Sequence, residues 1–235
     1  MKKVISLILV LVMCLSMFAC GKNQSDKEIF EISKTAYVNI CKAYEMTDII
    51  SRDLYEGWRI GVKEGKELLN SGNCAEYLTR KMDLTEDELR EGIAYLYIST
   101  KSQGVDYDWE DATEEDKEKF RAYDYSLFNY YNNNGKVMFS SIIWAVQDAY
   151  IVKGDTAKIK EHLDLAKASM RELSEKYSDY EHYPNLKNFY TETCAFFDFC
   201  MDCTGVTFDQ AAITIKDYRD NGRNYKNDLD FVFGE

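Results

Sequence analysis

Residues 25–70 decide the fold of this chain, and they read SDKEIFEISKTAYVNICKAYEMTDIISRDLYEGWRIGVKEGKELLN. Ser25 and Glu28 have the spacing of a capping box, in which two side chains satisfy each other's free backbone amides at a helix start. Apolar residues then recur every three or four positions, the period of one helix face: Ile29, Ile32, Ala36, Ile40, Ala43, Ile50 and Leu54. The stretch predicts one long first helix that ends near Leu69.

Three glycines follow in the same helix at intervals of four residues, at Gly57, Gly61 and Gly65. Each costs a helix interior about 0.8–1.0 kcal/mol relative to alanine, so the pattern needs a reason. Gly57 and Gly61 continue the apolar stripe, so we expect another helix or an aromatic ring to cross closely there, and the long helix to bend. A hinge or ligand groove beside Trp58 is the functional alternative. The GxxxxGK[ST] spacing of a phosphate loop is missing.

Further start and stop patterns divide the rest of the chain into shorter helices. Thr85 to Glu88 is a second capping box, and Asn132 to Gly135 is a stop. The stretch from Val137 to Val152 is apolar on nearly all sides, which predicts a central buried helix. Asn221-Gly222 is a candidate break in the last helix. The expected later helices cover about residues 85–102, 113–131, 137–152, 156–177, 184–204 and 207–235.

These patterns predict an all-α fold of about seven helices in antiparallel hairpins or an irregular bundle. The chain of 235 residues has one proline and twelve glycines, and alternating apolar runs typical of strands are missing. No linker-like stretch divides residues 26–235, so we expect a single helical domain there. Residues 154–173 faintly resemble a tetratricopeptide-type helix junction, but a second copy at that repeat's spacing is missing.

The first nineteen residues have the layout of a secretory signal. Lys2 and Lys3 precede an uncharged apolar run from Val4 to Ala19, and Cys20-Gly21 follows. The junction Met17-Phe18-Ala19-Cys20-Gly21 resembles the lipobox of bacterial lipoproteins. The resemblance implies a signal peptide at residues 1–19 and a diacylglycerol on Cys20, with residues 20–25 as a short tether. A plain secretory signal cut after Ala19 and an uncleaved signal-anchor are the alternatives.

The charge of the chain limits its partners. The formal net charge is −12, and residues 1–19 contain two lysines and no acids, so residues 20–235 carry 27 basic and 41 acidic side chains, or −14. Such an acidic body argues against nucleic acid as a partner, because its phosphates would be repelled. A surface lying flat on anionic lipid is disfavoured for the same reason. The membrane is therefore expected to be reached through the lipid on Cys20.

The cysteines do not form a recognisable metal or redox motif. Cys200-x-x-Cys203 is expected at the end of a helix, where the helix dipole opposes a thiolate, whereas catalytic pairs sit at a helix start. A zinc site would need further ligands, and the chain has only two histidines. Five cysteines remain after Cys20, an odd number: Cys41, Cys74, Cys194, Cys200 and Cys203. We expect buried free thiols, with a disulfide as the alternative, and no metal or cofactor.

Two further stretches carry candidate binding residues. Tyr177, Tyr180, Tyr183 and His182 form a polar-aromatic junction that could stack on a sugar, although packing between helices is the favoured interpretation. Residues 106–111 alternate carboxylates like a calcium loop, but Asp111 stands where the turn needs glycine. Trp58, Tyr177, Tyr180 and Tyr183 are the candidate binding surface.

The sequence points to location more than to activity. The chain lacks GxSxG, HExxH, SxxK and Gly-rich nucleotide motifs, and no catalytic residue is predicted. We therefore favour a membrane-anchored extracytoplasmic lipoprotein that binds or scaffolds a protein, peptide or sugar. A cell-envelope hydrolase with scattered carboxylates is the alternative, and a surface protein that captures a toxic protein or peptide is a third.

Overall fold

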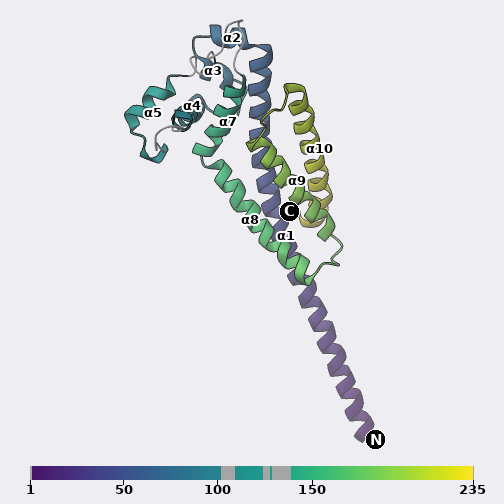
Figure 1. The fold of residues 1–235 in the computed structure, drawn as a ribbon. Helices are drawn as coiled ribbons and strands as arrows, with labels where there is room; N and C mark the ends of the chain where they lie inside the picture. The colour runs from purple at the N-terminus through teal and green to yellow at the C-terminus, as the bar shows by residue number, and fades with distance from the viewer. Residues whose placement is uncertain (1, 102–108, 124–127, 129–138, 235) are drawn as a thin grey trace.

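The computed structural model describes residues 2–101, 109–123, 128 and 139–234, and within them the chain is built from helices without a strand (Figure 1). In the first helix the side chains are described from Asp26 onward. The predicted all-α class with a long first helix is confirmed. The elements are α1 (Lys2–Lys63), α2 (Gly65–Asn70), α3 (Cys74–Thr79), α4 (Glu86–Lys101), the 3₁₀ turn η2 (Trp109–Asp111), α5 (Glu114–Arg121), α7 (Phe139–Val152), α8 (Asp155–Lys176), α9 (Tyr183–Met201) and α10 (Phe208–Phe233).

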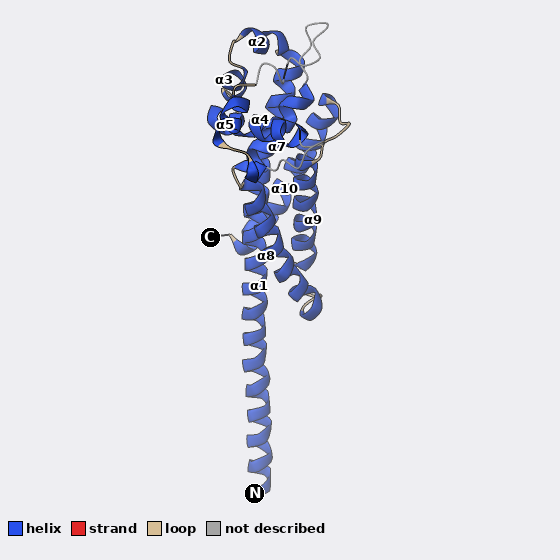
Figure 2. Ribbon diagram, turned by 60° about the vertical axis from the view of Figure 1, so that its left-hand side comes forward, coloured by secondary structure: helices blue, strands red, loops and turns tan. Residues whose placement is uncertain are grey.

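Helix α1 is continuous from Lys2 to Lys63, and its first part extends alone beyond the bundle (Figure 2). The expected helix start at Ser25 is therefore wrong. The helix passes through Gly21 to Gln24, so the carbonyl groups of that preceding turn accept the backbone amides that a cap would have paired. Of the three glycines where we expect a bend or break, only the third marks one: α1 continues through Gly57 and Gly61 and ends at Lys63, and α2 begins at Gly65.

The other long helices lie along α1 in alternating directions. Helices α7 and α8 follow one another antiparallel to α1, so that Tyr150 of α7 bonds Asp53 and His162 of α8 contacts Asn39. Helix α9 runs parallel to α1. Helix α10 is antiparallel to α1, from Phe208 stacked on Tyr55 to Phe233 beside Phe30. The result resembles a four-helix bundle made of α1, α9, α10 and the consecutive helices α7 and α8, which together occupy one position (Figure 1).

The predicted helix starts at three threonines are confirmed. Thr85 and Glu88 close a capping box before α4, and Thr207 and Gln210 close another before α10. Thr113 caps α5 by accepting from the amide of Asp116. Helix α5 ends at Arg121 instead of residue 131, because a tight turn follows in which the Tyr123 amide bonds the Phe120 carbonyl. The predicted stop at Asn132 to Gly135 lies outside the described residues.

Close helix crossings occur at glycines. A Cβ atom on Gly61 would lie 2.8 Å from the Phe139 Cβ atom, and one on Gly57 would lie 3.2 Å from Ile142. The predicted close approach at this stripe is therefore confirmed, and the approaching element is α7. Gly222 makes space for the ring of Tyr44, which explains why α10 continues through Asn221-Gly222 without the predicted break.

A smaller layer, formed by α4 and α5, covers the side of the bundle that α7 forms. Helix α4 packs against α7, where Gly92 lets the backbone of Ala145 and Ala149 come close. Helix α5 packs on α4 through Phe120 and Tyr97, whose ring centroids are 4.4 Å apart. These contacts form a satellite apolar cluster beside the main core. The short helices α2 and α3, which the sequence did not indicate, connect this layer to the end of α1.

Candidate functional site

The proposed lipid attachment point, Cys20, lies within α1 on the part that extends beyond the bundle. Its side chain lies outside the described residues. Asp26 is six positions further along the helix, and at 1.5 Å per residue that is about 9 Å. In the described part of the chain, no helix combines the length and apolar character that crossing a bilayer requires.

Trp58 does not belong to an exposed binding surface. Its side chain is 2 % exposed and lies in the main core with Leu54 and Ile60. The prediction of a ligand groove beside this indole is wrong because α7 crosses α1 at the adjacent glycines and closes the space. An aromatic residue next to a glycine stripe is compatible with both packing and binding, and here packing accounts for it.

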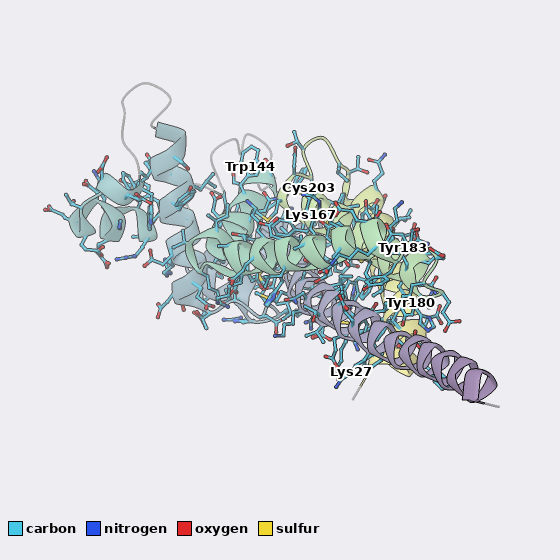
Figure 3. The ribbon with its side chains drawn as sticks, turned by 90° about the horizontal axis from the view of Figure 1, so that it is seen from below. Lys27, Trp144, Lys167, Tyr180, Tyr183 and Cys203 are labelled. Carbon is cyan, nitrogen blue, oxygen red and sulfur yellow. The ribbon has the colours of Figure 1, made fainter. Side chains whose placement is uncertain are left out.

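The three candidate tyrosines run from the C-cap of α8, Tyr177, to the first residue of α9, Tyr183. Tyr180 and Tyr183 lie near the end of the bundle where α1 leaves it (Figure 3). All three are partly buried. The Tyr180 ring meets His182 edge-on at 5.3 Å, and His182 meets Phe233 at 5.8 Å. Tyr177 shares a hydrogen bond with Glu28 of α1. These contacts pack the α8–α9 turn onto α1 and α10, as the favoured interpretation expects, and sugar stacking stays a prediction.

The five described cysteines are free, and all except Cys194 are buried. Cys200 and Cys203 lie at the end of α9, where the Gln147 amide donates to the Cys200 carbonyl at 2.7 Å and to the Cys203 sulfur at 3.4 Å. Burial raises the pKa of Cys203 to about 11 and that of Cys200 well above its ordinary value. Thiols in this state are poor nucleophiles, so the pair is structural.

Asp53 of α1 is a buried carboxylate that organises the connection between α3 and α4. It is 1 % exposed and accepts hydrogen bonds from the backbone amides of Asp83 and Leu84 and from the Tyr150 hydroxyl, at 2.7 Å. Burial raises its pKa, while these three donors stabilise the charged form. With its oxygens engaged in this way, Asp53 joins α1, α7 and the α4 start, and its role is structural.

Asp148 of α7 is the second carboxylate with a raised pKa. It is partly buried, and burial alone raises its pKa from 3.8 to about 7. No hydrogen bond or ion pair to it is formed by the described residues, and no charged group among them contributes to the shift. A carboxyl group that loses water without gaining a partner is destabilised in its charged form. Asp148 is therefore a polar group that the described residues leave poorly satisfied.

The face of α7 that carries Asp148 is open, so the prediction of a helix buried on nearly all sides is only partly right. Trp144 is 41 % exposed and Ile151 is 38 % exposed, whereas Ile142, Ala145 and Val146 on the other faces are buried. Trp144, Asp148 and Ile151 are spaced at i, i+4 and i+7, which places them on one helix face. We call these three residues the α7 face. Its Trp144 lies away from Tyr180 and Tyr183 (Figure 3).

Two open pockets have different chemistry. The first, about 640 Å³, lies between α4 and α5, and its arginines Arg90 and Arg121 are paired with glutamates of the same helices. The second, about 460 Å³, lies between α1 and α10 and joins Tyr55 and Ile213 to a wall of Lys216, Arg219 and Arg223. Neither pocket is lined by Asp53 or Asp148.

The acidic residues at the start of α5 stabilise that helix. Glu114, Glu115 and Asp116 occupy the first turn of α5, where carboxylates complement the helix dipole as expected. Residues 106–108 of the calcium-like stretch lie outside the described residues. Across the described part of the chain, His, Cys, Asp and Glu side chains form no group of three or more that could hold a metal ion.

Comparisons with protein families, with curated proteins and with solved structures find no match to this chain.

Proposed function

We propose that this chain is a membrane-anchored extracytoplasmic lipoprotein whose helical bundle acts as a binding or scaffolding module. Residues 1–19 serve as the signal peptide, Cys20 carries the lipid, and the bundle from residue 26 onward presents its sides to a partner. A diacylglycerol supplies two acyl chains, which is the number that stable anchoring requires.

The continuity of α1 is the observation that carries this proposal. One helix contains the two lysines and the apolar run that follows them, Cys20, and the central element of the bundle. A helix between anchor and bundle is a stiff connection, unlike a flexible tether, so the bundle stays at a defined distance from the bilayer. Its sides then face neighbouring molecules of the envelope, as a scaffold requires.

The arrangement of carboxylates favours binding over hydrolysis. A hydrolase of the kind considered above needs two acidic side chains that face one substrate, usually with separated pKa values. Among the described residues, Asp53 and Asp148 are the two carboxylates with raised pKa, and their surroundings differ: Asp53 is engaged by three donors inside the bundle, while Asp148 faces the open side of α7. Neither of these carboxylates lines either of the two pockets.

Replacing the modified cysteine tests the proposal. Cys20→Ala removes the thiol that would receive the diacylglycerol, so we expect the protein to leave the membrane fraction or to accumulate as an uncleaved precursor. Incorporation of a tagged fatty acid should be lost in the same variant. Cys194→Ala is the matched control, because it removes a partly exposed thiol far along the chain and should change neither result. If Cys20→Ala fractionates, migrates and labels like the wild type, the lipoprotein proposal is wrong.

A further inference from the structure

The α7 face combines three side chains with unmet interactions. Trp144 and Ile151 leave apolar area in water, and Asp148 between them is partly buried without a partner among the described residues. Trp144 and Ile151 are seven positions apart on the helix, a distance of about 10 Å. An aromatic ring one turn from a carboxylate can hold a cation by two means at once, because the ring face and the carboxylate both attract positive charge.

We propose that the α7 face binds a basic polypeptide segment, in which a lysine or arginine reaches Asp148 beside the Trp144 ring and an apolar side chain packs on Ile151. This inference rests on the proposed role of the bundle as a binding module, and it does not depend on the lipid anchor. Such a contact would supply the counter-charge that Asp148 lacks. It would also remove from water the two large side chains that flank it.

Charge complementarity selects a basic partner. Residues 20–235 carry a net charge of −14, so the field of the whole bundle attracts cationic molecules. The pocket between α1 and α10 also has positively charged side chains, but these are already paired within the chain. Lys216 pairs with Asp220 at 2.8 Å, and Arg219 pairs with Asp48 at 2.5 Å. Asp148 has no such partner among the described residues, and it is therefore the better place for an external charge.

Two synthetic helical peptides test the proposal. Both have about 14 residues, roughly four turns, with leucine on one face; the other positions are lysine in one peptide and glutamate in the second. The intact chain is placed in nanodiscs of zwitterionic lipid on a biosensor surface, and empty nanodiscs serve as the reference. We expect the lysine peptide to bind the protein and the glutamate peptide not to bind.

Variants then locate the binding. Asp148→Asn keeps the shape of the side chain, and we expect it to weaken the lysine peptide about tenfold, which corresponds to about 1.4 kcal/mol. Trp144→Leu and Ile151→Ser should each weaken it severalfold. The matched controls are Asp164→Asn and Leu165→Ser on α8, which remove an exposed charge and an exposed apolar side chain elsewhere. Thermal melts confirm that each variant is folded.

The outcomes separate this inference from the proposed function. Loss of binding in the three α7 variants with retention in the two α8 variants supports the α7 face. Equal binding by all variants would mean that acidity alone attracts the peptide, and it would overturn the assignment to α7. Absence of lysine-peptide binding to the wild type would overturn the basic partner itself. The lipoprotein proposal is unaffected by either result, because it is judged by the fate of Cys20→Ala.

Discussion

Single glycines determine how closely the helices of this bundle approach one another. Gly57 and Gly61 let α7 pack close to α1, and Gly92 lets the backbone of α7 pack close to α4. Gly222 leaves space for the ring of Tyr44. The helix-propensity cost of these glycines is thus offset by packing that a larger side chain would prevent. At Asp148 the opposite holds, because burial imposes a cost that no described neighbour offsets.

Gly61→Leu tests the close crossing of α1 and α7. A Cβ atom there would lie 2.8 Å from the Phe139 Cβ atom, so a leucine side chain must displace α7. Overpacking of this kind costs about 1–3 kcal/mol, and the better helix propensity of leucine returns only about 0.8 kcal/mol. We expect a lower thermal midpoint. Val62→Leu, one residue further on and 51 % exposed, is the control and should leave the midpoint nearly unchanged. A higher midpoint for Gly61→Leu would refute the crossing.

Asp148→Asn tests the unsatisfied carboxyl group through the pH dependence of stability. The pKa of Asp148 rises from 3.8 to about 7 on folding, so the native state binds a proton more tightly than the unfolded state. The stability that this group contributes is therefore complete below about pH 4 and is lost as the pH rises through about 7. We expect Asp148→Asn to gain stability relative to the wild type between about pH 5 and about pH 9.

Chemical denaturation at the two pH values measures this difference. Asp164→Asn is the control, because it removes an exposed aspartate of α8 and should leave the pH dependence of the wild type in place. A wild type and an Asp148→Asn variant whose stabilities change in parallel with pH would show that the Asp148 pKa is not raised by folding.

At the scale of the helix, local patterns predicted starts better than ends. Thr85, Thr113 and Thr207 cap the helices expected of them, because a capping side chain acts within one turn. Ser25 has the same pattern, but the helix already runs through the residues before it, so no cap is needed there. Asn221-Gly222 has the composition of a break and lies inside α10, because contact with Tyr44 outweighs local propensity. Such tertiary contacts are not visible in a sequence window.

The docking of α10 on α1 can be measured by a double-mutant cycle. A Cβ atom on Gly222 would lie 2.1 Å from the Tyr44 ring, and the Tyr44 hydroxyl donates to the Arg219 carbonyl at 2.7 Å. We expect Gly222→Ala to destabilise the protein in the wild-type background. In a Tyr44→Leu background the smaller side chain should relieve the clash, so Gly222→Ala should cost less there. The two substitutions should therefore couple by about 0.5–3 kcal/mol. Additive effects would mean that the ring does not occupy the space at Gly222.

At the scale of the whole molecule, the sequence predicted the class of fold and missed where side chains become accessible. The core face of α1 follows from its 3.6-residue period, and Ile40, Ala43 and Leu54 are buried accordingly. Trp58, a candidate binding residue, lies in the core, whereas Trp144 lies in a segment expected to be buried and is exposed. Accessibility of an aromatic residue depends on which helices cover it, and periodicity within one helix does not determine that.

Helix α1 contains both Cys20, the proposed attachment point, and the central element of the bundle, and its length gives the molecule its elongated shape (Figure 2). The proposed function therefore depends most on what happens at Cys20, where the mature chain would begin. The direct measurement is the mass of the N-terminal peptide released from the purified membrane form of the protein. We expect a peptide that begins at Cys20 and carries the added mass of a diacylglycerol. An unmodified peptide beginning at Cys20 or later, or a peptide that still contains residues 1–19, would contradict the lipid-anchored bundle.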